Sequence, residues 1–329
     1  MKFDSIKANE WLGRKMFLLI LFALTAGLIL KIPDSPCIRF ILMALFAYMT
    51  FVTTLGTSLQ HFTKVLLRPW IPLWALLLIH VATPLLAWLL GNILYPDAYH
   101  ARLGLLVGAA VPAGITSVIW AAFSAGNVPL TLTTVTLDTL IVPFLLPAYY
   151  HYIVGQAVAI DYTNLLIQLL LMVTLPSIAG MLINDWSKGK IAVFSLGSGG
   201  ISAKLAFFII MLLNGSLVAP GISWSPDMLQ MLLVAFLMVV FGYLLGYAGF
   251  RLIPGGTRDV ALALVYSVGL RNISCGLVIA VTYFPPAVAV PIMLCMFFQQ
   301  PLAAIVPHIF QYMDTWRERR HSKPQPAAE

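Results

Sequence analysis

Apolar residues run through this chain in ten long stretches that short polar segments separate. The first stretch, 16–30, carries no cleavage motif at its end, so we expect it to persist as a helix. The other nine are 37–55, 70–93, 103–124, 127–150, 162–183, 196–218, 228–250, 259–284 and 286–310. Each has about the 17 to 25 residues that an α-helix needs to cross a bilayer. The pattern predicts an all-α polytopic membrane protein with ten transmembrane helices.

Composition supports this prediction and excludes an ordinary soluble protein. Sixty per cent of the residues are hydrophobic, 9% are charged, and the mean hydropathy is +0.93, whereas about a quarter of a soluble domain is charged. Ten spans in 329 residues leave no room for a soluble domain. We therefore expect 1–329 to be one integral domain in the lipid bilayer, with its chemistry inside the helix bundle.

Positive charge is distributed unevenly between the two predicted sides of the membrane. With the N-terminus inside, fourteen basic residues lie on the cytoplasmic side: Lys2, Lys7, Arg14, Lys15, Lys64, Arg68, Lys188, Lys190, Arg251, Arg258, Arg317, Arg319, Arg320 and Lys323. Three lie on the other side: Lys31, Arg39 and Arg102. Short loops rich in lysine and arginine stay in the cytoplasm. We predict that both termini are cytoplasmic and that the protein lies in a plasma membrane, the inner membrane of a bacterium.

The same topology explains the net charge of +7, so no nucleic-acid partner is expected. The first fourteen residues should form a polar lead, and 311–329 a disordered cytoplasmic tail. The three cysteines, Cys37, Cys275 and Cys295, lack the spacing of a disulfide framework or a zinc site. No metal site is expected from them.

Two predicted spans are interrupted near their middles. In 103–124 the sequence VGAAVPAGITSVIW places Pro112 and Gly114 inside the helix, and proline removes a helical hydrogen bond and clashes with the preceding turn. In 259–284, Gly269 precedes the polar pair Arg271 and Asn272. Both helices should open there, which is tolerated at this depth only where protein or a wet cavity surrounds the backbone.

The two interrupted spans occupy equivalent places in the two halves of the chain. Each is the fourth of five spans, which divides the protein into repeats of about 15–151 and 161–310. Because five is an odd number, the second repeat must be inverted relative to the first. Matched broken helices in inverted repeats are typical of secondary transporters, whose site lies where the breaks meet.

Arg271 and Asp138 are the charged residues expected deepest in the membrane. Within a helix over 258–284, Arg271 lies roughly 18 Å from either end, which is beyond the reach of the headgroups. Asp138 is the acidic residue placed well inside a span, so we expect the two side chains to form an ion pair. The pair belongs either to a transport site or to a purely structural lock.

Other polar residues in the spans are candidates for binding. Thr131, Thr134 and Asp138 recur on one helical face, although a threonine in an apolar helix often bonds only its own backbone. His80 and Asp138 are each a candidate proton relay, although His80 is equally compatible with a residue that only donates to a neighbouring carbonyl. Gln299 and Gln300 offer amides in the last span.

The motifs around the breaks resemble those of the bile acid:sodium symporter family, and the resemblance covers nearly the whole chain. In the first half these are Pro112-x-Gly114-x-x-Ser117 and Gly126-Asn127-x-x-Leu130-Thr131, and in the second Val268-Gly269-Leu270-Arg271-Asn272. The resemblance implies a panel domain of spans 1, 2, 6 and 7 and a core domain of spans 3–5 and 8–10. It also implies paired sodium sites beside the crossed broken helices and an organic anion between the domains.

Carried over residue by residue, the resemblance places sodium ligands at Ser117 and Thr131 and substrate-facing side chains at Gln299 and Gln300. Four positions depart from the family pattern, where its Asn, Thr, Glu and Gln are replaced by Val118, Val135, Ser267 and Arg271. Sodium prefers several oxygen ligands, ideally with a carboxylate. This chain lacks that carboxylate and carries a guanidinium nearby, so its sodium sites are expected to be degraded.

Together these features predict a secondary transporter of a small organic anion that works by alternating access, and not an enzyme. Its expected site residues are Ser117, Asn127, Thr131, Thr134, Asp138, Ser267, Arg271, Asn272, Gln299 and Gln300. No cofactor is expected beyond a coupling ion, for which the sequence is compatible with Na⁺ or H⁺. The alternatives are a sodium symporter that retains one site, and a channel or sensor on the same fold.

Overall fold

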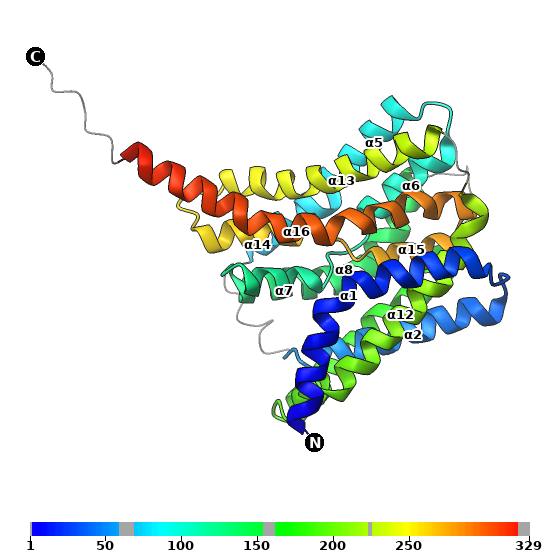
Figure 1. The fold of residues 1–329 in the computed structure, drawn as a ribbon, viewed down its shortest axis with the longest axis horizontal. Helices are drawn as coiled ribbons and strands as arrows, with labels where there is room; N and C mark the ends of the chain where they lie inside the picture. Colours follow the sequence, from blue (N-terminus) through cyan, green and yellow to red (C-terminus); the bar gives the residue numbers. More distant parts are fainter. Residues whose placement is uncertain (1, 59–68, 154–161, 223–225, 322–329) are drawn as a thin grey trace, which may run out of the picture.

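The structure is a computed structural model, which describes residues 2–58, 69–153, 162–222 and 226–321. Over these residues the chain is helical, apart from loops and one isolated β-bridge. The elements are α1 (Lys2–Leu30), α2 (Pro36–Thr54), α4 (Trp70–Leu77), η1 (Leu78–Ala82), α5 (Thr83–Leu94), α6 (Tyr99–Ala110), α7 (Thr116–Phe123), α8 (Val128–Ile153), α9 (Tyr162–Leu169), η3 (Leu170–Thr174), α10 (Leu175–Trp186), α11 (Ala192–Leu196), α12 (Ser198–Val218), η4 (Ala219–Gly221), α13 (Pro226–Arg251), α14 (Arg258–Gly269), α15 (Ile273–Tyr283) and α16 (Pro286–His321) (Figure 1).

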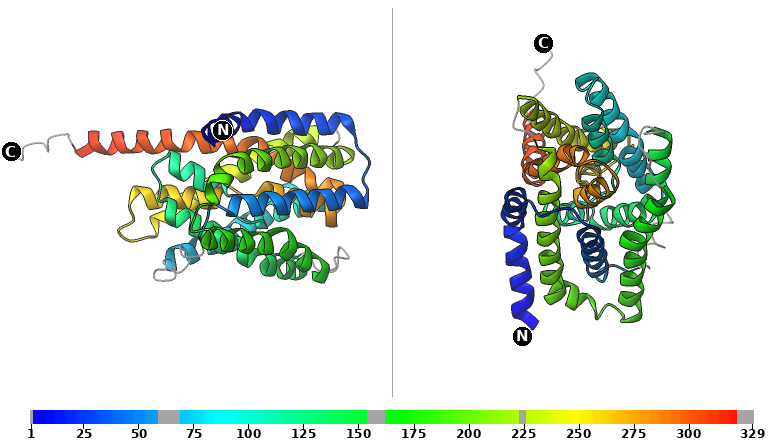
Figure 2. Two further views of the ribbon diagram at one scale, coloured as in Figure 1. Left: turned by 90° about the horizontal axis from the view of Figure 1, so that it is seen from below. Right: turned by 90° about the vertical axis from the view of Figure 1, so that its right-hand side faces the viewer.

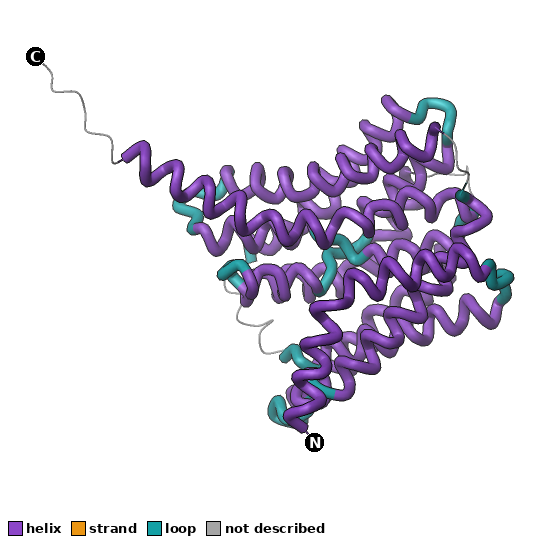
Figure 3. Tube along the Cα trace, viewed as in Figure 1, coloured by secondary structure: helices purple, strands orange, loops and turns teal. Residues whose placement is uncertain are grey.

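Long apolar helices dominate this bundle. In the described part of the chain, seven are long and apolar enough to cross a membrane, and α1 adds an eighth if its two arms, bent by 65°, count as one span. The two remaining predicted spans are divided into shorter helices, α6 with α7 and α14 with α15. Figure 3 shows the loops of these breaks in the middle of the bundle. This architecture is typical of a multi-pass membrane protein.

Both ends of the chain are more helical than the sequence predicted. The polar lead belongs to α1, and Asn9 in it donates a hydrogen bond to the Leu196 carbonyl at 2.8 Å. The prediction of disorder after residue 310 is wrong for 311–321, because α16 continues to His321 and extends beyond the bundle (Figures 1 and 2). Lys64, Arg68, Lys323 and the rest of the predicted tail lie outside the described residues.

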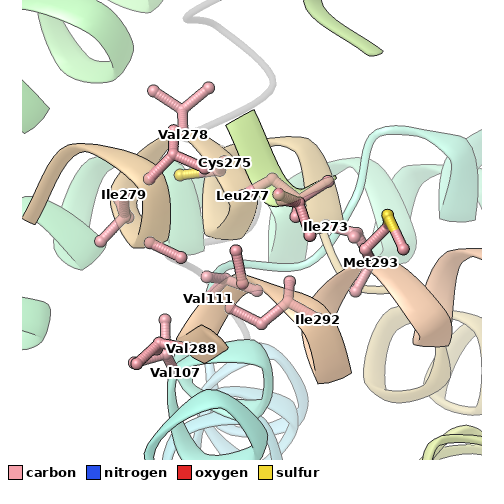
Figure 4. Close-up of a cluster of buried hydrophobic side chains, with 14 of the residues drawn as sticks. Val107, Val111, Ile273, Cys275, Leu277, Val278, Ile279, Val288, Ile292 and Met293 are labelled. Atoms are coloured by element: carbon pink, nitrogen blue, oxygen red, sulfur yellow. The ribbon is translucent and has the colours of Figure 1, made fainter. Parts of the chain in front are cut away.

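Two groups of helices pack within the bundle. In one, α12 packs on α1 and α2, and α2 packs on α10; in the other, α16 packs on α6 and α13, and α13 packs on α14. The α1–α12 contact depends on small residues, because a Cβ atom at Gly27 would collide with the Leu212 carbonyl oxygen and one at Gly215 with that of Leu24. The two groups share one buried apolar cluster, part of which Figure 4 shows around Val111, Leu277 and Ile292.

Candidate functional site

The linkers of the two broken spans lie side by side in antiparallel orientation. Ala113 and Arg271 form the isolated β-bridge. On either side of it, the Gly114 N–H donates to the Leu270 carbonyl at 2.7 Å, and the Asn272 N–H donates to the Pro112 carbonyl at 2.8 Å. Each linker therefore satisfies backbone groups that the other leaves exposed at the middle of the bundle.

The first linker is shaped by proline and glycine. Helix α6 ends at Ala110 and α7 begins at Thr116, so the chain leaves the helix across Pro112 and Gly114. A Cβ atom at Gly114 would lie 3.2 Å from the Arg271 carbonyl oxygen, so glycine permits the close approach of the second linker. The buried Ser117 hydroxyl donates to the Gly114 carbonyl at 2.7 Å. This hydroxyl is therefore bonded to its own linker.

The second linker is shaped by a tight helix end and a helix cap. Helix α14 ends at Gly269, where a Cβ atom would collide with the Tyr243 ring. Asn272 is the N-cap of α15, and its side-chain oxygen accepts from the Cys275 N–H at 3.3 Å. The cap begins the second half of the broken span immediately after Arg271.

Gln299 of α16 completes the hydrogen bonding of the Arg271 backbone. With its amide oxygen facing the donor, Gln299 accepts from the Arg271 N–H at 3.0 Å and donates to the Arg271 carbonyl at 3.1 Å. The Tyr243 hydroxyl donates to the Gln299 carbonyl at 2.8 Å and so fixes this position of α16 to α13. Gln299 thus supports the linker, and Tyr243 is a site residue that the sequence did not single out.

The Arg271 guanidinium is buried and binds backbone carbonyls. The exposed fraction of Arg271 is 6%. Nη1 donates to the Val111 carbonyl at 3.2 Å, Nη2 donates to the Ile79 carbonyl at 2.7 Å, and Nε has no partner among the described residues. Val111 follows the C-terminal end of α6, where the helix dipole is negative. A fixed positive charge therefore lies where the carbonyl oxygens of two elements converge.

Asp138 of α8 is fully buried, and each of its carboxylate oxygens has another partner. One carboxylate oxygen lies 2.5 Å from Nε2 of His80, and the other accepts from the Ala113 N–H at 2.6 Å. The predicted ion pair between Asp138 and Arg271 is therefore wrong, since no such pair occurs among the described residues. The two charges act on each other electrostatically, but each has its hydrogen-bond partners elsewhere.

His80 reaches Asp138 from a local widening of the helix. Residues Leu78–Ala82 form a π-helical turn, in which the Thr83 N–H bonds the Leu78 carbonyl five residues back. Pro84 follows and has no N–H for the His80 carbonyl, which is a sequence signal for this irregularity. Single π-turns are frequent at functional sites. The same turn supplies the Ile79 carbonyl to Arg271.

The threonines of α8 bond their own helix. The hydroxyl of Thr131 donates to the Asn127 carbonyl at 3.0 Å, and that of Thr134 donates to the Leu130 carbonyl at 2.9 Å. Both residues are buried. These bonds agree with the simpler of the two sequence interpretations, in which the threonines satisfy the backbone.

Asn127 and Gln300 each connect two helices, and both lie outside the two linkers that form the β-bridge. Asn127 accepts from the Leu130 N–H at 3.0 Å as a cap of α8, and its amide donates to Asp259 at 2.8 Å. Gln300 accepts from the Trp120 indole at 2.8 Å. Ser267 is buried in α14. Asp138, Arg271, Asn272 and Gln299 therefore lie together at the β-bridge, whereas Asn127 connects the start of α8 to α14 through its hydrogen bond with Asp259.

In the described part of the chain, the helix bundle contains two cavities, one beside Arg271 and one near the α1–α2 loop. A small one of about 30 Å³ is lined by Arg271, Gln299, Thr83 and several glycines, and offers room for a water molecule. A larger one of about 390 Å³ lies where the α1–α2 loop meets the ends of α12 and α15, and Lys31, Asp34 and Arg39 line it. Arg39 donates to the Thr282 carbonyl at 2.7 Å and so ties α2 to the end of α15.

Residues 40–220 match the Sodium Bile acid symporter family. The chain is 33% identical over 271 residues to the uncharacterized protein YbaS of Bacillus subtilis, covering 82% of this chain and 87% of that protein. It is 25% identical over 245 residues to the uncharacterized sodium-dependent transporter YocS of the same species, covering 72% and 73%. It is also 27% identical over 217 residues to the probable sodium/metabolite cotransporter BASS1, chloroplastic, of rice, covering 65% of this chain and 52% of the plant protein.

Proposed function

Because the chain belongs to the sodium bile acid symporter family, we propose that it is a secondary transporter that carries a small organic anion by alternating access. The family consists of transporters and not enzymes. The observation that carries the proposal is the buried Arg271 guanidinium beside two paired helix breaks. Deep charges and non-helical backbone are typical of transport sites.

The architecture in this proposal has ten spans in two inverted repeats, about 15–151 and 161–310. Helices α1, α2, α9–α10 and α12 form the panel, and the other spans form the core. Support comes from the packing of α12 on α1 and α2, and of α16 on α6 and α13. The antiparallel pairing of the two linkers is also what an inverted relation between the repeats predicts. Both termini lie in the cytoplasm of a bacterium.

Arg271 acts in this proposal as a fixed cation. Carbonyl oxygens are ligands that hard cations prefer, and here the carbonyls of Val111 and Ile79 bind the guanidinium. The hydroxyls of Ser117 and Thr131 bond their own backbone, and Ser267 stands where the family's glutamate is expected. We infer that the sodium sites are degraded and that transport depends weakly on sodium.

The anion binds between the panel and the core, where the positive charge of Arg271 attracts it. The larger cavity, with Lys31 and Arg39 in its wall, lies between α12 of the panel and α15 of the core and would admit an anion from the outside. The partners are a small organic anion and the bilayer, and no nucleic acid takes part.

A sodium-coupled symporter that retains one site is the second candidate. The family description and the names of the B. subtilis and rice relatives, which mention sodium for those proteins, favour it. Its remaining ligands would be the hydroxyls of Ser117 and Thr131 with nearby carbonyls. These hydroxyls would then have to exchange their present acceptors for the ion.

Uptake into proteoliposomes tests the proposal. The purified protein is reconstituted, and uptake of labelled carboxylates and sulfonates, from lactate to taurocholate, is measured with a sodium gradient, with a pH gradient and with neither. We expect saturable uptake and counterflow of at least one anion, with less than a threefold effect of sodium. Strict sodium dependence supports the second candidate. Uptake that neither saturates nor counter-exchanges indicates a channel, and no uptake of any anion contradicts the proposed function.

A further inference from the structure

We propose that His80 and Asp138 form the proton-binding site of this transporter, so that one proton moves with each monovalent anion. The inference rests on the proposed transport function and names its coupling ion. The observation behind it is the buried contact between Asp138 and His80. This contact connects the π-helical turn, which carries His80, with the first linker, whose Ala113 N–H donates to Asp138.

The contact is enclosed and direct. The His80 side chain is 11% exposed and that of Asp138 is 0% exposed, and Nε2 lies 2.5 Å from the carboxylate oxygen. Imidazole is the side chain that changes charge between about pH 5 and 8. The carboxylate lies where it can share a proton with the ring, and 11% of the His80 side chain remains accessible.

Within the described part of the chain, three further ionisable groups act on this pair or on one another. Arg271, in the linker after α14, and Cys275, in α15, both interact electrostatically with Asp138, and Tyr149 of α8 interacts with Arg271. Cys275 is a buried thiol that packs in the apolar core. The charge of the cluster is therefore decided by Arg271, Asp138 and His80.

Counting these charges gives the stoichiometry. With His80 neutral, the positive charge of Arg271 and the negative charge of Asp138 cancel. Uptake of one proton by His80 leaves the cluster with one positive charge, which one bound monoanion returns to zero. An uncompensated charge at this depth is unfavourable, so binding of the proton and binding of the anion should each favour the other.

The pair is also connected to both linkers. The second oxygen of Asp138 accepts from the Ala113 N–H in the first linker. His80 lies next to Ile79, whose carbonyl accepts from Arg271 in the second linker. A change of charge on His80 therefore acts on both linkers through one hydrogen bond each.

The first test needs no transported substrate. Protein labelled with ¹⁵N-histidine is placed in lipid nanodiscs, and the charge of His80 is followed by NMR from pH 5 to 8, with His80→Gln to identify its signal. We expect His80 to change charge in this range, and the isosteric Asp138→Asn to lower its protonated fraction at pH 7 at least tenfold. His80 that keeps one charge state throughout, or that does not respond to Asp138→Asn, overturns the inference.

The second test follows proton movement with the anion. Proteoliposomes containing a pH dye receive the best-transported sulfonate of the panel, because a sulfonate does not cross the bilayer as a neutral acid. We expect internal acidification with a ratio near one proton per anion, and at least a tenfold loss of pH-driven accumulation in His80→Gln. His308→Gln is the matched control, since His308 is exposed and its ring hydrogen-bonds the Ala304 carbonyl of its own helix.

The outcomes separate the two proposals. Saturable anion uptake without acidification overturns proton coupling and leaves the transport function intact. If no anion is transported, the proposed function fails, and the NMR titration alone decides whether His80 and Asp138 bind a proton.

Discussion

The first broken span leaves its helix through Pro112 and Gly114, whereas the second leaves through Gly269 and Arg271. The first linker offers backbone groups: the carbonyl of Val111 accepts from Arg271, that of Pro112 accepts from Asn272, and the N–H of Ala113 donates to Asp138. The second linker pairs its own backbone with the first and adds two side chains, a guanidinium and a capping amide. The two breaks are paired in space but differ in chemistry.

This difference shows how the charged groups near the two linkers are divided between the halves of the chain. The first half carries the acid and the imidazole, Asp138 and His80, and the second half carries the cation. With His80 neutral, neither half balances its own charge at this depth. The first break should therefore tolerate side-chain changes that preserve its backbone, whereas the second should depend on the identity of Arg271.

Arg271→Gln should have the largest effect. It removes the cation that binds the Val111 and Ile79 carbonyls and leaves both buried acceptors without their donor, which costs about 1–3 kcal/mol for each unsatisfied group. We expect a matching loss in the free energy of unfolding in detergent and at least a tenfold loss of uptake. Arg271→Lys should fold but bind the anion less tightly, because it lacks the planar fork.

Arg258→Gln is the control for Arg271→Gln, since Arg258 is a half-exposed arginine paired with Asp314. An exposed pair contributes roughly 0–1 kcal/mol, so this variant should be nearly as stable as the parent. Equal stability of the two variants would mean that the second break does not depend on its charge.

A pair of double-mutant cycles sharpens the comparison between the halves. Asp138→Asn with His80→Gln should show a coupling energy of about 1–3 kcal/mol, because the side chains are in direct contact. Asp138→Asn with Arg271→Gln should couple less, since these side chains act on each other only through space. Unfolding in denaturant measures both cycles. A larger coupling to Arg271 than to His80 would restore the ion pair that the sequence suggested.

Gly269→Ala and Gly114→Ala compare the two linkers directly. A Cβ atom at Gly269 would collide with the ring of Tyr243, which Gln299 holds in place, whereas one at Gly114 would lie 3.2 Å from the Arg271 carbonyl oxygen. Overpacking typically costs about 1–3 kcal/mol, and we expect Gly269→Ala to fall in this range and Gly114→Ala below it. Thermal unfolding measures both. The order is wrong if Gly114→Ala is the less stable variant.

The smallest effect is expected at the far end of the second broken span, where Arg39 ties α2 to Thr282. The Arg39 guanidinium hydrogen-bonds Asp34 and lowers the pKa of that carboxyl below its ordinary value of 3.8. A lowered pKa stabilises the folded state at pH values above 3.8, and this contribution is lost as pH falls through the lower folded value. Melting temperature should decline below pH 4, and less so in Asp34→Asn. Both side chains are more than a third exposed, so the difference should be small.

The helices and the positions of the breaks could be predicted from the sequence, because apolar length and the positions of Pro112, Gly114 and Gly269 are local properties. The partner of Asp138 could not. Helical periodicity gives the depth of a side chain in the membrane but not the neighbour it faces, and the π-helical turn before Pro84 changes the direction of His80. The sequence suggested Arg271 as the partner of Asp138 and named His80 only as a candidate proton relay, whereas the structure places His80 against the carboxylate.

The place of Asn127 shows a different limit. A family motif suggested that it belongs to the transport site, but Asn127 directly precedes α8, where Pro129 follows, and this is the pattern of a helix cap. Its contact with Asp259 is long-range and could not be read from local pattern. The sequence therefore indicated that Asn127 caps α8, but it did not indicate the hydrogen bond from Asn127 to Asp259 of α14.

The bridge between the linkers has a consequence for how the protein is made. Arg271 and Val111 are hydrogen-bonded although 160 residues separate them, so the first broken helix enters the membrane during synthesis long before its partner exists. Until then, the first linker has no partner for the Gly114 N–H and the Pro112 carbonyl, and hydrocarbon is a poor place for unpaired backbone. We therefore expect the first half to remain shallow or incompletely inserted in the membrane until the ribosome has synthesised the second half.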